Sequence, residues 1–208
     1  MCGIVVYWKR DGLSSVDHSI LERMTDTLEH RGPDDRGIHI KDSIGLGVRR
    51  LSIIDVLGGH QPMHGENEAI WLVFNGEIYN HRALSETLLL KSHHFNSVCD
   101  SEVIVHLFEE YGPQCVDQLD GFFSFAIWDE PEQTLFMARD RLGQKPLYYF
   151  YDGLMFLAAS ELKAIIDHPA VSREIDLQGV NEFLTNRFMA PPTTIFRQIH
   201  KLPAGHWL

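Results

Sequence analysis

The chain opens with Met1-Cys2-Gly3-Ile4-Val5-Val6-Tyr7-Trp8, an apolar run that predicts a buried strand over residues 2–8. Cys2 stands at the head of that strand, so removal of Met1 would place a thiol and a free α-amine on one residue. An α-amine titrates near ~7.7–8.0 and a free thiol near ~8.5, so at neutral pH the amine can accept the thiol proton. On these residues alone, however, a cysteine that simply packs in the core is the preferred interpretation, because free cysteines are commonly buried.

Outward from this strand, the apolar periodicity predicts an alternation of strands and helices without regular βαβ units. Helices are predicted over residues 16–29, 82–91, 100–111, 161–167 and 177–186, and strands over residues 37–40, 44–54, 69–74, 122–128, 134–138, 147–151 and 154–158. Asp100 is expected to cap its helix and Gly112 to end it. Turn signals such as Asp152-Gly153 separate the last four strands and predict a meander of antiparallel hairpins. The predicted class is α+β, with helices covering antiparallel sheets.

Size and composition fit one globular domain over residues 1–208. The formal net charge of −11 disfavours nucleic-acid and anionic-membrane partners but is compatible with a small zwitterionic substrate. Three cysteines without paired spacing, and the lack of a signal peptide or a membrane-length apolar run, predict a cytoplasmic protein.

The 12 histidines raise the question of a metal site. Only His60 with His64, and the adjacent His93 and His94, are close together in the sequence. Pro62 prevents helical i,i+4 presentation of the first pair, and no carboxylate or cysteine cluster lies beside either pair in the sequence. We therefore expect no metal site in this chain.

Several residues could serve thiol-dependent amide hydrolysis, which needs a nucleophile, an oxyanion hole and groups that hold the substrate. The side-chain amide of Asn75 and the backbone N–H of Gly76 follow an apolar strand and could form the oxyanion hole, although Asn-Gly is also a common hairpin turn. The Arg50 guanidinium could pair with a substrate α-carboxylate, or take part in a structural ion pair. Asp100 could bind a substrate ammonium group as well as cap its helix.

Seven segments, in order, resemble the glutamine-hydrolysing domain of B-type asparagine synthetases. They are Cys2-Gly3-Ile4, Arg31-Gly32-Pro33-Asp34, Arg50-Leu51-Ser52-Ile53-Ile54-Asp55, Asn75-Gly76-Glu77-Ile78-Tyr79-Asn80, Asp100-Ser101-Glu102, Arg139-Asp140-Arg141-Leu142-Gly143 with Pro146-Leu147-Tyr148-Tyr149, and Ser160-Glu161-Leu162-Lys163-Ala164. The resemblance extends to Leu208, and the joint order of the motifs makes chance an unsatisfactory explanation.

The resemblance implies a class II glutamine amidotransferase domain with the N-terminal nucleophile hydrolase fold, a four-layer αββα sandwich with two antiparallel sheets. It implies that Cys2 is the nucleophile after loss of Met1, and that Asn75 and Gly76 stabilise the oxyanion. L-glutamine would be held by a set of binding residues, with Arg31 to Asp34 as a supporting loop. The binding residues implied are Arg50, Leu51, Ser52, Ile53, Ile54, Asn75, Gly76, Glu77 and Asp100.

The family also implies partners outside this chain. Asparagine synthetases continue into an ATP-pyrophosphatase domain with a Ser-Gly-Gly-x-Asp-Ser loop, which residues 1–208 do not contain. That C-terminal synthetase domain would bind ATP, Mg²⁺ and aspartate, so this domain needs no cofactor of its own; the family also suggests a homodimer. The chain stops where another strand would begin, as expected of part of a longer protein. Two alternatives stay open: the glutaminase half of an amidotransferase with a sugar or peptide acceptor, and a non-catalytic scaffold remnant.

Overall fold

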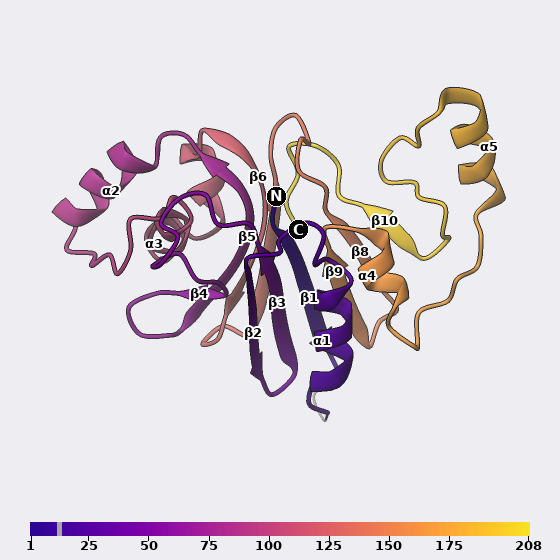
Figure 1. Ribbon diagram of the computed structural model, residues 1–208, viewed down its shortest axis with the longest axis horizontal. Helices are drawn as coiled ribbons and strands as arrows, with labels where there is room; N and C mark the ends of the chain where they lie inside the picture. Colours follow the sequence, from indigo (N-terminus) through magenta and orange to yellow (C-terminus); the bar gives the residue numbers. More distant parts are fainter. Residues whose placement is uncertain (12–13) are drawn as a thin grey trace.

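The computed structural model describes residues 1–11 and 14–208 and shows two antiparallel sheets packed face to face between helices (Figure 1). One sheet has six strands in the order β10-β8-β9-β1-β3-β2, and the other has four in the order β4-β5-β6-β7. The strands are β1 (Gly3–Lys9), β2 (Asp35–Lys41), β3 (Ile44–Arg50), β4 (Met63–His64), β5 (Ile70–Ile78), β6 (Gly121–Asp129), β7 (Thr134–Arg139), β8 (Tyr148–Tyr151), β9 (Met155–Ala159) and β10 (Ile199–Lys201). The helices are α1 (His18–Asp26), α2 (His81–Leu90), α3 (Glu102–Tyr111), the 3-10 helix η1 (Gly112–Gln118), α4 (Leu162–Ile166) and α5 (Leu177–Asn186).

Three buried clusters separate the four layers. Ile4 and Val6 of β1 meet Val73 of β5 and Trp128 of β6 between the two sheets. The opposite faces of the sheets are covered by helices: α1 and α4 pack on the six-stranded sheet, and α3 packs on the four-stranded sheet. Strand residues therefore alternate between two apolar environments, which explains why β1 reads as a continuous apolar run. The predicted αββα sandwich is confirmed.

Strand β1 lies in the interior of the six-stranded sheet. It pairs with β3 on one side, with Gly3 opposite Arg49, and with β9 on the other, with Val5 opposite Ala159. Because the strand is held on both edges, the position of Cys2 immediately before it is fixed by two ladders of hydrogen bonds.

Two predicted strand boundaries are wrong in ways that bear on function. The strand predicted over residues 69–74 runs on to Ile78, so Asn75-Gly76 lies inside β5 and is no hairpin turn. The strand predicted over residues 44–54 ends at Arg50, and the chain then leaves the sheet as a loop. The predicted meander is also divided, since β6 and β7 pair in one sheet while β8 and β9 form a hairpin in the other.

Asp100 does not cap α3, contrary to the prediction. The N-cap residue is Ser101, and the Asp100 side chain instead accepts a hydrogen bond from the backbone N–H of Ile78 at 2.8 Å. Gly112 does end the helix as predicted, with a φ of 55° that favours glycine.

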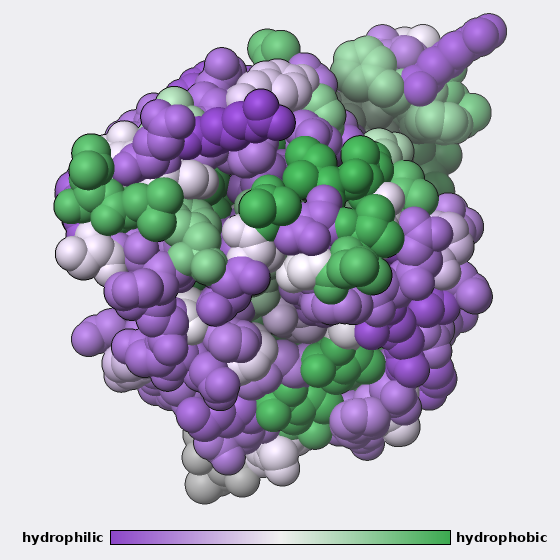
Figure 2. Space-filling view, turned by 60° about the vertical axis from the view of Figure 1, so that its left-hand side comes forward, coloured by the Kyte–Doolittle hydropathy of each residue, from purple (hydrophilic) through white to green (hydrophobic). Residues whose placement is uncertain are grey.

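The segment around α5 stands away from the sandwich and is the most exposed part of the fold (Figures 1 and 2). Leu177, Leu184 and Phe188 present apolar side chains to solvent there. Elsewhere the face shown in Figure 2 is mostly hydrophilic with separate apolar patches. Within residues 1–11 and 14–208, no helix is long and apolar enough to cross a membrane.

Candidate active site

A cavity of about 190 Å³ lies at the head of β1, beside the end of β5. This volume is below the ~300–1,000 Å³ of pockets for drug-sized ligands and suits a molecule of amino-acid size. Nine of the ten predicted site residues line it: Cys2, Arg50, Leu51, Ile53, Ile54, Asn75, Gly76, Glu77 and Asp100. Segments far apart in the sequence therefore meet around one small space.

Cys2 is half-buried, and two groups hold its position. Its thiol lies 3.8 Å from the carbonyl oxygen of Leu51, to which it donates. Its own carbonyl accepts a hydrogen bond from Arg31 Nε at 2.9 Å, and the Arg31 guanidinium is in turn paired with Glu161. Burial raises the pKa of the Cys2 thiol above its usual value, so the thiol needs a nearby base to become a nucleophile at neutral pH. The loop that contains Arg31 thus lies against Cys2.

Asn75 offers a hydrogen-bond donor to this cavity. The side chain is 1% exposed, and its Nδ2 has no hydrogen-bond partner among the described residues. A buried donor without a partner costs roughly 1–3 kcal/mol, so such groups are rare unless a ligand or water satisfies them. The unpaired amide marks the place where an acceptor atom of a bound molecule would lie.

The backbone N–H of Gly76 points to the edge of β5 to which the N–H groups of Phe74 and Ile78 also point. In a strand the N–H groups of alternate residues point the same way, and those on either side of Gly76 are already used. The Phe74 N–H donates to Gln61 Oε1 at 2.7 Å, and the Ile78 N–H donates to Asp100 Oδ2 at 2.8 Å. The Gly76 N–H lies between these two pairs and faces the cavity side.

Glycine is required at position 76 because the neighbouring strand approaches closely. A Cβ at this position would lie 2.2 Å from the carbonyl oxygen of Phe122 on β6. The absence of a side chain at Gly76 thus allows β6 to pack closely against β5, next to Asn75.

Arg50 is buried, at 3% exposure, at the end of β3. Its Nη2 donates to the carbonyl oxygens of Ile54 at 2.9 Å and Asp55 at 2.8 Å, and its Nη1 donates to that of Val56 at 3.3 Å. A guanidinium has five N–H donors, so these three bonds leave two. Arg50 therefore shapes the loop after β3 and retains positive charge and donors for an anion in the cavity.

Two carboxylates line another part of the cavity. Burial raises the pKa of Asp100, although the hydrogen bond from Ile78 acts in the opposite direction. Burial also raises the pKa of Glu77, and the nearby Asp100 carboxylate adds to the effect. A cation bound between them would relieve this repulsion. With Arg50 also in the wall, the cavity carries both signs of charge and is complementary to a zwitterion.

Ser52 is the predicted site residue that is not found in the wall, as far as the described residues define it. Its backbone N–H donates to Asp34 Oδ2 at 2.9 Å, which ties the loop after β3 to the loop that holds Cys2. Ser52 thus belongs to the support of the cavity.

Six further residues line the cavity that sequence reasoning did not assign to it: Met1, Gln61, Phe74, Cys99, Phe122 and Lys145. The side chain of Gln61 lies at the edge of β5, where it accepts the hydrogen bond from the Phe74 N–H. No local sequence pattern predicts this contact. Lys145 lies with its Nζ 4.4 Å from the centre of the Phe122 ring, and burial lowers its pKa.

The position of Lys145 follows from the Arg139-Asp140 motif. The buried carboxylate of Asp140 accepts backbone hydrogen bonds from Phe123, Leu142, Gln144 and Lys145 itself, at 2.9–3.2 Å. Arg139 donates to the carbonyl oxygens of Lys145 and Gly143, both at 2.6 Å. The motif is therefore a rigid turn that places a lysine at the cavity.

The chain is similar in sequence to asparagine synthetases over 80% or more of its own length. The chain is 38% identical to an asparagine synthetase [glutamine-hydrolyzing] of Bacillus subtilis over 100% of its own length and 34% of the relative, and 42% identical to one of Arabidopsis thaliana over 80% and 29%. It thus spans about a third of the length of these relatives. The matches confirm the resemblance seen in the motifs.

Solved structures support the fold. The glutamine phosphoribosylpyrophosphate amidotransferase of B. subtilis superimposes with a TM-score of 0.66 at 22% identity, covering 79% of this chain and 43% of that one. An allosteric regulatory enzyme of purine biosynthesis gives 0.64 at 22% identity, covering 80% and 43%. Residues 1–208 as a whole match the family described as the glutamine amidotransferase domain. The chain therefore belongs to the family of glutamine amidotransferase domains.

Proposed function

We propose that this chain hydrolyses the side-chain amide of L-glutamine to glutamate and ammonia, with Cys2 as the nucleophile once Met1 is removed. The observation that carries the proposal is the unpaired Nδ2 of Asn75, a buried donor in the wall of the cavity that Cys2 also lines. An oxyanion hole needs donors that are in place before the charge develops. Family membership supplies the substrate class.

The charges of the cavity suggest how glutamine binds. The α-carboxylate pairs with Arg50, and the α-ammonium lies against Glu77 and Asp100. Leu51, Ile53 and Ile54 line the cavity beside these groups, with the exposed Ile53 at the rim. The side-chain amide then reaches Asn75, Gly76 and the thiol.

The reaction proceeds in two halves. The Cys2 α-amine takes the thiol proton, the sulfur attacks the amide carbon, and the tetrahedral oxyanion is held by Asn75 Nδ2 and the Gly76 N–H. Collapse breaks the C–N bond, the amine returns its proton to the departing nitrogen, and ammonia leaves a γ-glutamyl thioester. Water, deprotonated by the same amine, then attacks the thioester to give glutamate and regenerate the thiol. Only the pKa of the amine, near ~8, has to match the working pH.

The ammonia is proposed to serve asparagine synthesis from aspartate. The chain's asparagine synthetase relatives are about three times its length, and the rest of such a protein would contain the sites for aspartate, ATP and Mg²⁺. We further propose that the protein works in the cytoplasm, since its three cysteines, Cys2, Cys99 and Cys115, are all free thiols.

The test uses a glutamine-analogue alkylating agent and intact-mass spectrometry on protein that has lost Met1. We expect one adduct, mapped to Cys2, and release of glutamate from glutamine. Cys99 also lines the cavity, so Cys99→Ala is the matched control for the site of alkylation: it should keep the adduct, whereas Cys2→Ala should lose both the adduct and the activity. Processed protein that neither reacts nor releases glutamate would favour the scaffold alternative and refute the proposal.

A further inference from the structure

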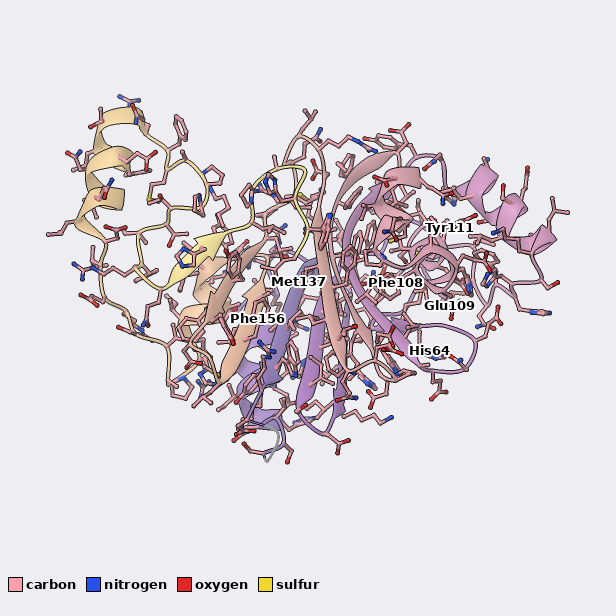
Figure 3. The ribbon with its side chains drawn as sticks, turned by 180° about the vertical axis from the view of Figure 1, so that it is seen from behind. His64, Phe108, Glu109, Tyr111, Met137 and Phe156 are labelled. Carbon is pink, nitrogen blue, oxygen red and sulfur yellow. The ribbon has the colours of Figure 1, made fainter. Side chains whose placement is uncertain are left out.

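Four potential metal ligands converge beside α3, outside the cavity at Cys2. Glu66 comes from the connection between β4 and β5, His93 from the segment after α2, and His106 and Glu109 from α3 itself. One ligand atom of each lies within 4.8 Å of the others. Figure 3 labels Glu109 together with Phe108 and Tyr111 of the same helix.

The spacing of these atoms is close to that of a tetrahedral site. Glu109 Oε2 lies 2.8 Å from His106 Nδ1 and 3.5 Å from His93 Nδ1, and Glu66 Oε1 lies 3.4 Å from His93 Nδ1 and 3.9 Å from His106 Nδ1. With bonds of about 2.0–2.2 Å, tetrahedral Zn²⁺ separates its ligand atoms by roughly 3.3–3.6 Å. The two separations from His93 Nδ1 fall in this range, and an ion would have to widen the contact between His106 and Glu109.

A second carboxylate lies beside each imidazole. His93 Nε2 forms a hydrogen bond with Glu110 Oε1 at 3.2 Å, and His106 Nε2 lies 3.8 Å from Glu102 Oε1. Histidines that ligate metals almost always donate their other N–H to such a partner, which fixes the tautomer. For His93 this bond leaves Nδ1 as the atom that faces the cluster, whereas His106 Nε2 has no hydrogen-bond partner among the described residues.

The cluster has an excess of negative charge. Four carboxylates, those of Glu66, Glu102, Glu109 and Glu110, surround the two imidazoles, and Lys91 pairs only with Glu110. This excess of negative charge attracts a divalent cation.

We propose that Glu66, His93, His106 and Glu109 form a structural Zn²⁺ site. Two imidazole nitrogens and two carboxylate oxygens are ligands that zinc accepts, and four protein ligands are typical of a structural zinc site. His106 is 1% exposed and His93 12%, whereas Glu66 is 41% exposed and leaves a route for the ion. The expectation of no metal site rested on histidines adjacent in sequence, and these ligands come from three separated segments.

The ion would hold together three separate segments of the chain. His93 belongs to the chain between α2 and α3, and Glu102 accepts hydrogen bonds from the Asn96 and Ser97 N–H groups of the same stretch. That stretch continues into Cys99 and Asp100 in the wall of the cavity. Metal binding is independent of the chemistry at Cys2, and we expect it to stabilise the fold whether or not the chain hydrolyses glutamine.

The test is Zn²⁺ titration of untagged protein in competition with a chromophoric chelator, after stripping with EDTA. A Cys2→Ala background removes the thiol as a competing ligand. We expect one equivalent of Zn²⁺, a rise in thermal midpoint that EDTA reverses, and with Co²⁺ the visible absorption of tetrahedral coordination. Bound metal stabilises in proportion to the logarithm of its concentration over Kd, so the midpoint must rise with added Zn²⁺.

Substitutions identify the ligands. His93→Ala and Glu66→Gln, at the more exposed positions, should each weaken Zn²⁺ binding more than about tenfold, and Glu110→Gln, which acts through His93, should weaken it about 10- to 100-fold. His94→Ala is the matched control, since this neighbouring exposed side chain is outside the cluster, and it should bind Zn²⁺ normally. Absence of binding, or equal binding by all four variants, would overturn the proposal and leave an ion-pair network centred on His106.

Discussion

Substitution of Asn75 by alanine should separate activity from stability. The Nδ2 of Asn75 has no partner in the described structure, so truncation removes no protein hydrogen bond from that atom. Its removal relieves a desolvation penalty of about 1–3 kcal/mol, while the space left by the side chain acts in the opposite direction. We therefore expect the free energy of unfolding to change by no more than about 1 kcal/mol.

The effect on catalysis should be much larger. Loss of one oxyanion-hole donor lowers kcat by about 10²–10³, which corresponds to roughly 2.7–4 kcal/mol of transition-state stabilisation. Since the donor acts on charge that appears only in the transition state, kcat and kcat/KM should fall together. The glutamine KM should change little.

Steady-state glutamate release and urea denaturation of the same preparations provide the assay. Asn80→Ala is a matched control, because the Asn80 amide is fully engaged, donating to the Gln118 carbonyl at 2.8 Å and accepting from the Asp120 N–H at 3.0 Å. That variant should lose about 1–3 kcal/mol of stability and keep its kcat. If Asn75→Ala reduces kcat less than tenfold, or if the two variants behave alike, the oxyanion assignment is refuted.

Three further outcomes follow from the geometry. Gly76→Ala should reduce glutaminase activity and lower the urea midpoint, because its methyl group would lie 2.2 Å from the Phe122 carbonyl oxygen; unchanged values would contradict the need for close approach. Asp140→Ala leaves the backbone N–H groups of Phe123, Gln144 and Lys145 unpaired, at a cost of about 1–3 kcal/mol each. The free energy of unfolding should therefore fall by at least about 3 kcal/mol. A smaller loss would show that other contacts hold the turn after Arg139. In protein that retains Met1, burial raises the pKa of the Cys2 thiol. The alkylation rate of Cys2 should therefore continue to increase at pH values above about 8.5, where a free thiol is half ionised. A rate that reaches its plateau at lower pH would exclude a raised pKa.

Much of the fold could be predicted because its strands have two-sided apolar surroundings. Strand β1 and helix α3 were located from their apolar residues alone, and the turn at Asp152-Gly153 joins β8 to β9 as expected. The predicted strand ends are wrong next to the candidate site. Strand β5 continues through Asn75-Gly76 because its exposed edge is completed by side chains, those of Gln61 and Asp100, which no local propensity records.

The candidate site also contains residues that the sequence predicts and residues that it does not predict. Cys2, Arg50 and Asn75 were identified through motif resemblance, and the structure brings them to one cavity. Lys145 was missed because it reaches the cavity only through the turn that Asp140 organises. The histidine and glutamate cluster was missed for a related reason: its members lie on three segments, and only the packing of α3 against two loops makes them neighbours.

The place of β1 in its sheet also has a consequence for how the protein is made. One of its two partners, β9, pairs Val5 with Ala159, which lies 154 residues further along the chain. At about 5–20 residues per second, a ribosome needs roughly 8–30 s to complete that partner after β1 emerges. The head of β1 therefore spends many seconds without its second neighbour, a period in which an aminopeptidase can reach Met1 before the sheet closes around the cysteine.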